Sequence, residues 1–223
     1  MKQVIQIRCK NNKKSQKVEI GSTLFDIFSA FDLKMTHGPV SARVNNKVEG
    51  MHYRVYNSKD VEFLDMTSSS GSRAYTRTLF FVLCKAVQDI YPATDVVIDI
   101  PVSNGFYVDI RLGRPVVDED VNIIRRRMQE IIDARMPIRR FTVPTEEAVA
   151  LFQEKGDVEK VKLLKTSGSI YTTYYKIGDY VDYYYGTLLT NTSQLYLFGL
   201  EKYYDGMLLR IPSLKNPDEL GEM

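Results

Sequence analysis

Histidine and cysteine, the side chains that most often bind transition metals or act as nucleophiles, are scarce in this sequence. Among 223 residues there are two histidines, His37 and His52, and two cysteines, Cys9 and Cys84. Both histidines belong to the N-terminal part of the chain, and the cysteines are far apart. We therefore expect no transition-metal site, no cofactor and no disulfide framework, and the cysteine usage favours a reducing compartment.

Motifs that bind nucleotide phosphates or activate a serine are also missing. The chain has neither a GxxxxGK[ST] phosphate loop nor a GxGxxG run that leads into a helix. The serine-rich segment TSSSGS at residues 67–72 lacks the GxSxG pattern of a nucleophile elbow and has no histidine nearby. The sequence in hand therefore carries no recognisable phosphoryl-transfer or serine-hydrolase motif.

Basic and aromatic residues could instead contact RNA. Thirty basic and twenty-eight acidic residues leave a net charge of +2, which leaves room for a local basic face. Residues 125–127 are three successive arginines, but on a helix they point about 100° apart, which favours a solvated helix face. Ten of the fifteen tyrosines lie between Tyr171 and Tyr204. They could stack on bases, although packing on a sheet is the interpretation we favour.

The first 66 residues have the pattern of a small α+β unit. Short alternating segments at 4–7 and 17–20 predict two strands, and Thr23 with Asp26 predicts a helix start. Further strands are expected at 41–44 and 60–64. This order suggests a β-grasp, ubiquitin-like fold.

Residues 67–72 predict a linker, and a long helix is expected over 73–92 because apolar residues recur there at spacings of three and four. Beyond it we expect strands at 95–100 and 106–111, a helix from Asp118, a strand at 141–143, helices from Thr145 and Asp157, and a tyrosine-rich antiparallel region. The fold class is thus α+β, with a central antiparallel sheet in a larger domain at 73–212. Residues 213–223 form a polar tail or linker.

Several runs, in order, resemble the second additional, editing-type domain of threonyl-tRNA synthetases. They are KAVQDIYP (85–92), SNGFYVDI (103–110), RRMQEII (126–132), PTEEAVALFQEKG (144–156) and GDYVDYYYG (178–186). The run ARVNNKVEG and the strand order of the first 66 residues resemble the TGS domain that precedes it in these enzymes. The resemblance covers nearly the whole chain.

The same resemblance implies that the editing chemistry is lost. The family pattern has an HxxxH pair on the first helix and a CxxxH pair in the segment GDxVDxCxGxH. In this chain the first pair falls on Arg77 and Phe81, and the second on Tyr184 and Leu188. Arginine neither binds zinc nor acts as a general base, since its pKa lies above about 12.

Part of the family's cleft is retained. Tyr107, Lys160 and Asp182 match positions that line the cleft in the family. We expect Lys160 and Asp182 to form an ion pair; alternatively, they hold a ribose or an amino group of a small ligand.

Three hypotheses follow. The first is a non-catalytic regulatory or binding module, because a similar TGS and editing-type pair resembles the N-terminal extension of bacterial uridine kinase-like proteins. That resemblance implies a P-loop kinase domain following this segment, and an ATP-dependent uridine kinase as the parent protein. The second is an RNA- or nucleotide-binding module, whose candidate contacts are Arg73, Arg77, Arg125, Arg126, Arg127, Arg139 and Arg140. The third is a residual aminoacyl-ester hydrolase that uses water held by Lys160 and Asp182.

No apolar run approaches the roughly 18–20 residues that span a bilayer. The alternating N-terminus has no signal-peptide core. We therefore expect a cytoplasmic protein without a membrane partner.

Overall fold

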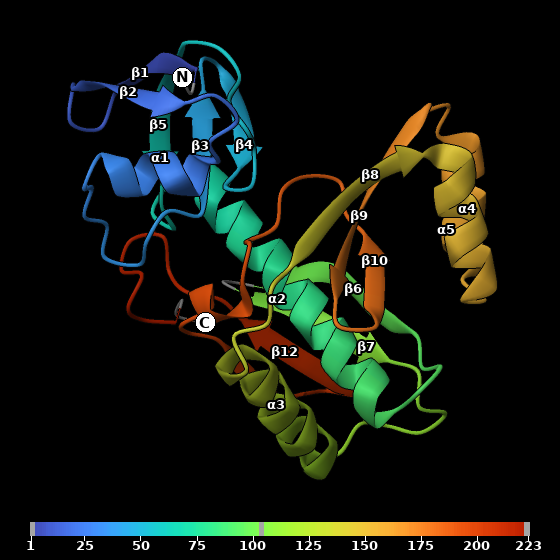
Figure 1. Cartoon of the computed structure of the whole chain (residues 1–223). Helices are drawn as coiled ribbons and strands as arrows, with labels where there is room; N and C mark the ends of the chain where they lie inside the picture. Colours follow the sequence, from blue (N-terminus) through green and yellow to red (C-terminus); the bar gives the residue numbers. More distant parts are fainter. Residues whose placement is uncertain (1–2, 103–104, 221–223) are drawn as a thin grey trace. The chain divides into compact units, whose positions relative to one another are not determined.

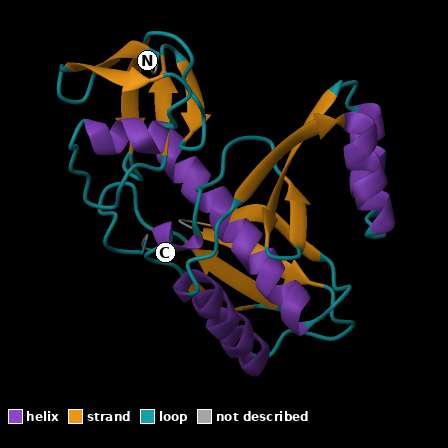
Figure 2. Ribbon diagram, in the orientation of Figure 1, coloured by secondary structure: helices purple, strands orange, loops and turns teal. Residues whose placement is uncertain are grey.

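A computed structural model describes residues 3–102 and 105–220, apart from the side chain of residue 99. Two residues of the run 103–110 and three of the predicted tail, 221–223, lie outside the described residues. The chain forms two compact units, Met1–Met136 with Thr187–Met223, and Pro137–Gly186. Helices and several separate sheets make up the fold (Figure 2), which agrees with the predicted α+β class.

The first unit begins with a five-stranded sheet in the order β2-β1-β5-β3-β4 (Figure 1). Its strands are β1 (Val4–Cys9), β2 (Ser15–Glu19), β3 (Ser41–Val44), β4 (Lys47–Gly50) and β5 (Lys59–Leu64). The central pair β1 and β5 is parallel, and the other pairs are antiparallel.

One short helix, α1 (Leu24–Ala30), packs on this sheet through Leu24 and Ile27. It starts where the sequence predicted, because Thr23 caps the helix and its backbone N–H donates to the Asp26 carboxylate at 2.8 Å. The cap also lowers the pKa of Asp26, chiefly through the hydrogen bonds from Thr23.

The long helix α2 (Ser69–Ile90) begins four residues earlier than predicted and takes up most of the predicted linker. Ser68 is its N-cap and accepts a hydrogen bond from the Gly71 N–H at 3.0 Å. A Cβ atom at Gly71 would overlap the Asp65 carbonyl oxygen, so the first turn of α2 lies tightly against the end of β5. The division into domains at 1–66 and 73–212 stays a prediction.

The rest of the first unit is a four-stranded antiparallel sheet in the order β11-β12-β7-β6. Its strands are β6 (Val96–Val102), β7 (Gly105–Ile110), β11 (Gly199–Tyr203) and β12 (Gly206–Arg210). Helices α2 and α3 (Asp118–Asp133) pack together; α2 contacts β6, and α3 contacts β11 and the short 3-10 helix η1 (Thr192–Gln194). The predicted inner face of α3 is buried: Val121, Ile124, Met128, Ile131 and Ile132.

The second unit holds a three-stranded antiparallel sheet, β10-β9-β8, and a pair of helices. The elements are β8 (Arg139–Pro144), α4 (Thr145–Glu154), α5 (Val158–Thr166), β9 (Tyr171–Ile177) and β10 (Tyr180–Tyr183). Ala148, Phe152, Leu164 and Val181 form its small core. Within residues 73–212 the strands thus form two separate antiparallel sheets, a four-stranded one in the first unit and this three-stranded one in the second.

The predicted tail folds back as far as it is described. Pro212 bridges to Leu220, and the Ser213 N–H donates to the Glu219 carbonyl at 2.8 Å. The Asp218 carboxylate lies 3.0 Å from His37 Nε2, and the His37 ring stacks on Tyr196 with centroids 3.8 Å apart.

Over residues 3–102 and 105–220, no helix has both the length and the apolar character needed to cross a membrane.

Candidate functional site

Helix α2 carries the first two positions at which the resemblance implied metal or substrate ligands. Arg77 is partly buried, and its Nε donates to the Thr187 carbonyl oxygen at 3.1 Å. One turn further along, Phe81 is completely buried. These side chains offer a fixed cation and a hydrocarbon ring in place of two imidazoles.

The segment after the second unit runs along the same part of α2. The Leu189 N–H donates to the Thr78 hydroxyl at 2.9 Å, and that hydroxyl donates to the Ala74 carbonyl at 2.8 Å. Leu188, at the third ligand position that the resemblance implied, is therefore held in the first unit and is only 2% exposed. Two of the four positions are thus core side chains, because Phe81 and Leu188 provide apolar area that the fold buries.

Tyr184 occupies the fourth position and belongs to the second unit, where it is partly buried. A phenol hydroxyl binds zinc poorly compared with a thiolate or an imidazole. Within the described residues, no group of three or more histidine, cysteine, aspartate or glutamate side chains could hold a metal ion. The residues present at these four positions do not fit a zinc site.

The second unit brings together Lys160 of α5 and Asp182 of β10. The Lys160 ammonium lies 2.8 Å from Asp182 Oδ1 and 2.7 Å from Asp157 Oδ2. Asp157 is the N-cap of α5, and its other carboxylate oxygen accepts a hydrogen bond from the Lys160 N–H at 3.0 Å. The ion pair expected from the sequence is therefore present, and it includes a second carboxylate that the sequence analysis did not single out.

Asp182 is buried, and its carboxylate has partners at both oxygens. Oδ1 also accepts from the Tyr183 N–H at 2.7 Å, and Oδ2 accepts from the Tyr180 hydroxyl at 3.0 Å. Both carboxylate oxygens of Asp182 are therefore engaged by donors of the protein itself, and neither faces an open position for water.

Lys160 is held in its charged form. Burial opposes the charge, but attraction to Asp182 and hydrogen bonds from the ammonium to Asp157 and Asp182 outweigh it, so the pKa of Lys160 lies above its ordinary value. The ammonium also lies 5.7 Å from the centre of the Phe152 ring. A charged ammonium donates hydrogen bonds but cannot act as a general base.

Tyr107, the third cleft position that the resemblance implied, lies on β7 in the first unit. Its ring packs edge-on against Tyr203, with centroids 6.3 Å apart. Burial, together with the negative charges of Asp109 and Asp205, raises the pKa of Tyr107, so its hydroxyl stays protonated. The structure therefore joins Lys160 to Asp182 in one unit and places Tyr107 in the other.

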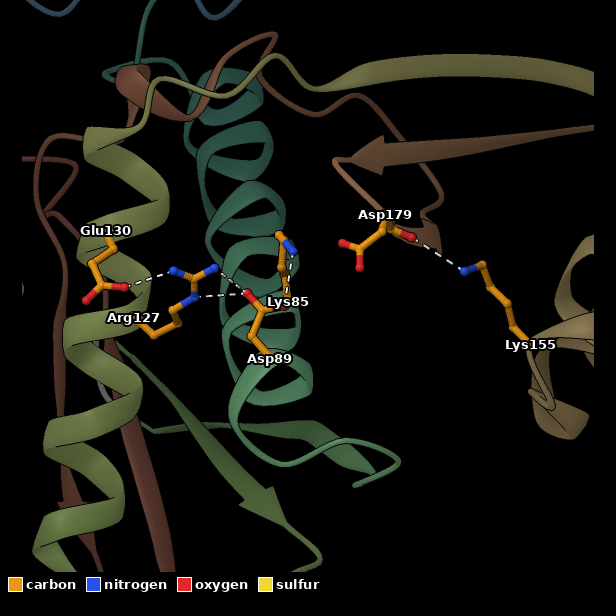
Figure 3. Close-up of polar contacts among 6 residues, drawn as sticks. All are labelled: Lys85, Asp89, Arg127, Glu130, Lys155 and Asp179. Atoms are coloured by element: carbon orange, nitrogen blue, oxygen red, sulfur yellow. Dashed lines mark hydrogen bonds and ion pairs between the residues drawn. The ribbon is translucent and has the colours of Figure 1, made fainter.

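The candidate RNA-contacting arginines differ in the hydrogen bonds and ion pairs that they form within the protein. Arg127 Nε lies 2.9 Å from Asp89, and its Nη1 lies 2.8 Å from Glu130 (Figure 3). Hydrogen bonds to Glu130 and Asp89 raise the pKa of Arg127, and these two carboxylates offset its positive charge within the fold. The other candidates on exposed positions are Arg73, Arg125, Arg126, Arg139 and Arg140.

Two of these arginines have short local contacts. Arg125 donates to the Asn122 side chain at 2.8 Å, and Arg73 donates to the Ser70 hydroxyl at 3.3 Å. Arg139 and Arg140 belong to β8 of the second unit. Their role in RNA binding stays a prediction.

Sequence comparison finds threonine–tRNA ligases as relatives of this chain. No protein-family model matches the chain. It is 29% identical over 181 residues to the threonine–tRNA ligase of Acetivibrio thermocellus, covering 81% of this chain and 28% of that protein. It is 30% identical to that of Clostridium kluyveri (86% and 30% covered) and 30% identical to that of Syntrophotalea carbinolica (87% and 32% covered).

The chain is homologous to threonine–tRNA ligase over most of its length. It spans less than a third of the length of these relatives.

Proposed function

We propose that the chain is a non-catalytic binding module, made of a TGS-like β-grasp unit and an editing-type scaffold that no longer carries hydrolytic chemistry. The observation that supports this most is the packing at the family's ligand positions. Phe81 and Leu188 are core residues, and Arg77 is tied to the Thr187 carbonyl. Arginine, phenylalanine and leucine are not zinc ligands, and the hydroxyl of Tyr184 is a poor one.

The proposed setting is a parent protein in which a uridine kinase-like P-loop domain follows this segment. Support for this setting is the sequence resemblance alone. In that arrangement the kinase domain would phosphorylate uridine with ATP, and this segment would regulate or target it. Incubation of the purified chain with uridine and ATP checks that this segment itself does not phosphorylate uridine, and we expect no uridine monophosphate.

Hydrolysis is the activity that tests the proposal. Transfer RNA carrying a seryl ester is incubated with the chain, and the loss of ester is compared with buffer. Mild alkali serves as the control that the ester can be released. We expect the chain to leave the rate unchanged; accelerated loss that depends on Asp182 would support the residual hydrolase instead.

RNA binding is the second candidate, and the homology to proteins named as tRNA ligases favours it. The chain would then bind transfer RNA without hydrolysing its ester. Phosphate contacts release counterions, so such binding must weaken steeply with salt. This candidate is excluded if no tRNA is retained on a filter at low salt, or if the amount retained does not change with the salt concentration.

A further inference from the structure

The first hairpin of the chain holds a dense group of positive charges. Residues 8–17, RCKNNKKSQK, contain five basic residues and no acidic one: Arg8, Lys10, Lys13, Lys14 and Lys17. All five are exposed. Within the described residues, none of their side chains forms an ion pair or a hydrogen bond. We call this group the hairpin cations.

The hairpin cations concentrate positive charge in one short segment of a chain whose net charge is only +2. Two other basic residues of the same sheet have acidic partners: Arg43 lies 2.7 Å from Glu62, and Lys47 lies 3.0 Å from Glu49. Five like charges without partners repel one another and weaken the fold. Such a group is therefore most simply explained by a polyanionic partner that neutralises it.

The loop that carries three of these lysines is held in one conformation. The Cys9 N–H donates to the Lys14 carbonyl at 2.8 Å and closes the hairpin. Asn11 pairs with Phe63 of β5 in both directions, at 3.0 and 2.7 Å. Lys13 has a φ of 59°, in the left-handed region that non-glycine residues seldom adopt. The backbone that carries the charges is therefore ordered before any partner binds.

A polar hollow adjoins the hairpin cations on the face of the sheet opposite α1. Its volume is about 350 Å³, and its lining includes Arg8, Ser15, Gln6 and Asn45. Arg8 lies opposite Ser15 on β2, and Gln6 lies opposite Lys17. Guanidinium, hydroxyl and amide groups are the side-chain donors that most often contact phosphate oxygens in nucleic-acid complexes.

One acidic residue, Asp60, also lines this hollow. It lies opposite Arg8 on β5, yet no ion pair joins the two side chains in the described part of the chain. The Asp60 N–H donates to Asn45 Oδ1 at 3.1 Å, which holds the Asn45 side chain at the edge of the hollow. The negative charge of Asp60 therefore repels an anion in the hollow, and removal of that charge tests whether an anion binds there.

We propose that the hairpin cations and the adjoining hollow bind the phosphate backbone of an RNA. The hollow accepts one phosphate beside Arg8, and the lysines of the loop contact neighbouring phosphates along the strand. This inference rests on the RNA-binding candidate and not on the absence of hydrolysis. It assigns the RNA contact to the N-terminal sheet, which the arginines singled out from the sequence did not include.

The test measures binding of a fluorescent tRNA transcript to the chain by anisotropy at salt concentrations from about 50 to 200 mM. The variant Lys10→Gln/Lys13→Gln/Lys14→Gln should weaken binding at least about tenfold at the lowest salt. It should also reduce the slope of log affinity against log salt by about 2–3, one for each phosphate that the variant no longer neutralises. All three side chains are exposed and their removal relieves repulsion between like charges, so the temperature of thermal unfolding should not fall.

A matched control removes three lysines elsewhere in the same unit, as Lys34→Gln/Lys202→Gln/Lys215→Gln, and should change affinity less than about twofold. The change Asp60→Asn should tighten binding, because it removes the one repulsive charge in the hollow. Inorganic phosphate and uridine monophosphate should compete only at millimolar concentrations, since each occupies a single phosphate position.

Three outcomes overturn the proposal, and they differ in what else they exclude. If the intact chain binds no RNA at low salt, the RNA-binding candidate fails with it. If RNA binds and the triple variant behaves like the unchanged chain, while Arg73→Gln/Arg125→Gln/Arg126→Gln releases it, only the hairpin assignment fails. If uridine monophosphate binds as tightly as tRNA, the hollow is a site for a small phosphate ester and not for RNA.

Discussion

At the scale of single residues, the second unit holds a largely buried ion pair between Lys160 and Asp182. Its partners Asp157 and Tyr180 complete a closed set of hydrogen bonds. A set of charges that satisfies itself stabilises its unit and leaves little for a ligand. We therefore expect removal of this pair to affect stability first.

Replacing Lys160 by methionine leaves Asp182 buried without its cation. We expect Lys160→Met to destabilise the second unit by about 2–4 kcal/mol, and the double change Lys160→Met/Asp182→Leu to be less harmful than the single one. Hydrogen exchange of the β9 and β10 backbone amides in the intact chain measures the free energy of unfolding of this unit. The exposed control Lys162→Met should shift it by less than about 0.5 kcal/mol. Additive effects in the double variant would contradict the pairing.

Asp120 gives a second residue-scale prediction, through pH. The carboxylate is buried and accepts from Arg114 at 2.6 and 2.8 Å, from the Tyr91 hydroxyl at 2.6 Å and from the Val117 N–H at 2.9 Å. The Arg114 hydrogen bonds lead the causes that hold the pKa of Asp120 far below its usual range, against the opposing effect of burial. Its folded pKa thus lies below its unfolded value of about 3.9.

The stability that Asp120 contributes is therefore fully present above about pH 4–5 and is lost as the pH falls further. We expect Asp120→Asn to lower the free energy of unfolding by about 2 kcal/mol at pH 7. The difference from the unchanged chain should shrink toward pH 2. Urea unfolding across this range checks it, with the exposed Asp118→Asn as control. A gap that stays constant with pH would show that the charge of Asp120 is not what stabilises the fold.

At the scale of elements, the sequence predicted those whose signals are local. Thr23 with Asp26 fixes the start of α1, and the apolar spacing from Val121 to Ile132 fixes the buried face of α3. The start of α2 was misplaced because serine and glycine favour turns by propensity, whereas here Ser68 caps the helix and Gly71 fits a close backbone approach. That approach is a tertiary contact, which the local pattern does not contain.

The start of α2 leads to an element-scale prediction. Gly71→Ala should destabilise the first unit by about 2 kcal/mol or more, although alanine favours helices by about 1 kcal/mol over glycine, because its methyl group meets the Asp65 carbonyl. Ser69→Ala, exposed in the same turn, should be nearly neutral. Thermal unfolding of the two variants compares them. Equal tolerance of both changes would mean that the segment is a loose linker.

At the scale of the whole molecule, the sequence predicted the α+β class but not the division into sheets. The chain leaves the first unit at Met136 and returns at Thr187, so neighbouring tyrosine-rich strands end in different sheets. Strand periodicity indicates which residues are extended and is silent on which strands pair. The Lys160 and Asp182 contact was predicted through a resemblance, and Asp157 could have been added from its spacing of three residues on a helix.

The same scale carries the central proposal, which is that packing residues stand where the resemblance implied hydrolytic side chains. Phe81 and Leu188 are as much a part of the core as Leu79 or Val82. A buried phenylalanine and leucine contribute roughly 1.5–3 kcal/mol each to folding, so these positions now serve stability.

The most direct test is the first-order rate at which a seryl ester is lost from tRNA when the chain is in excess, compared with buffer at the same pH. We predict rates within about twofold of each other, for the unchanged chain and for Asp182→Asn alike. An acceleration of about tenfold or more that Asp182→Asn abolishes would contradict this, because the retained lysine and aspartate would then be catalytic.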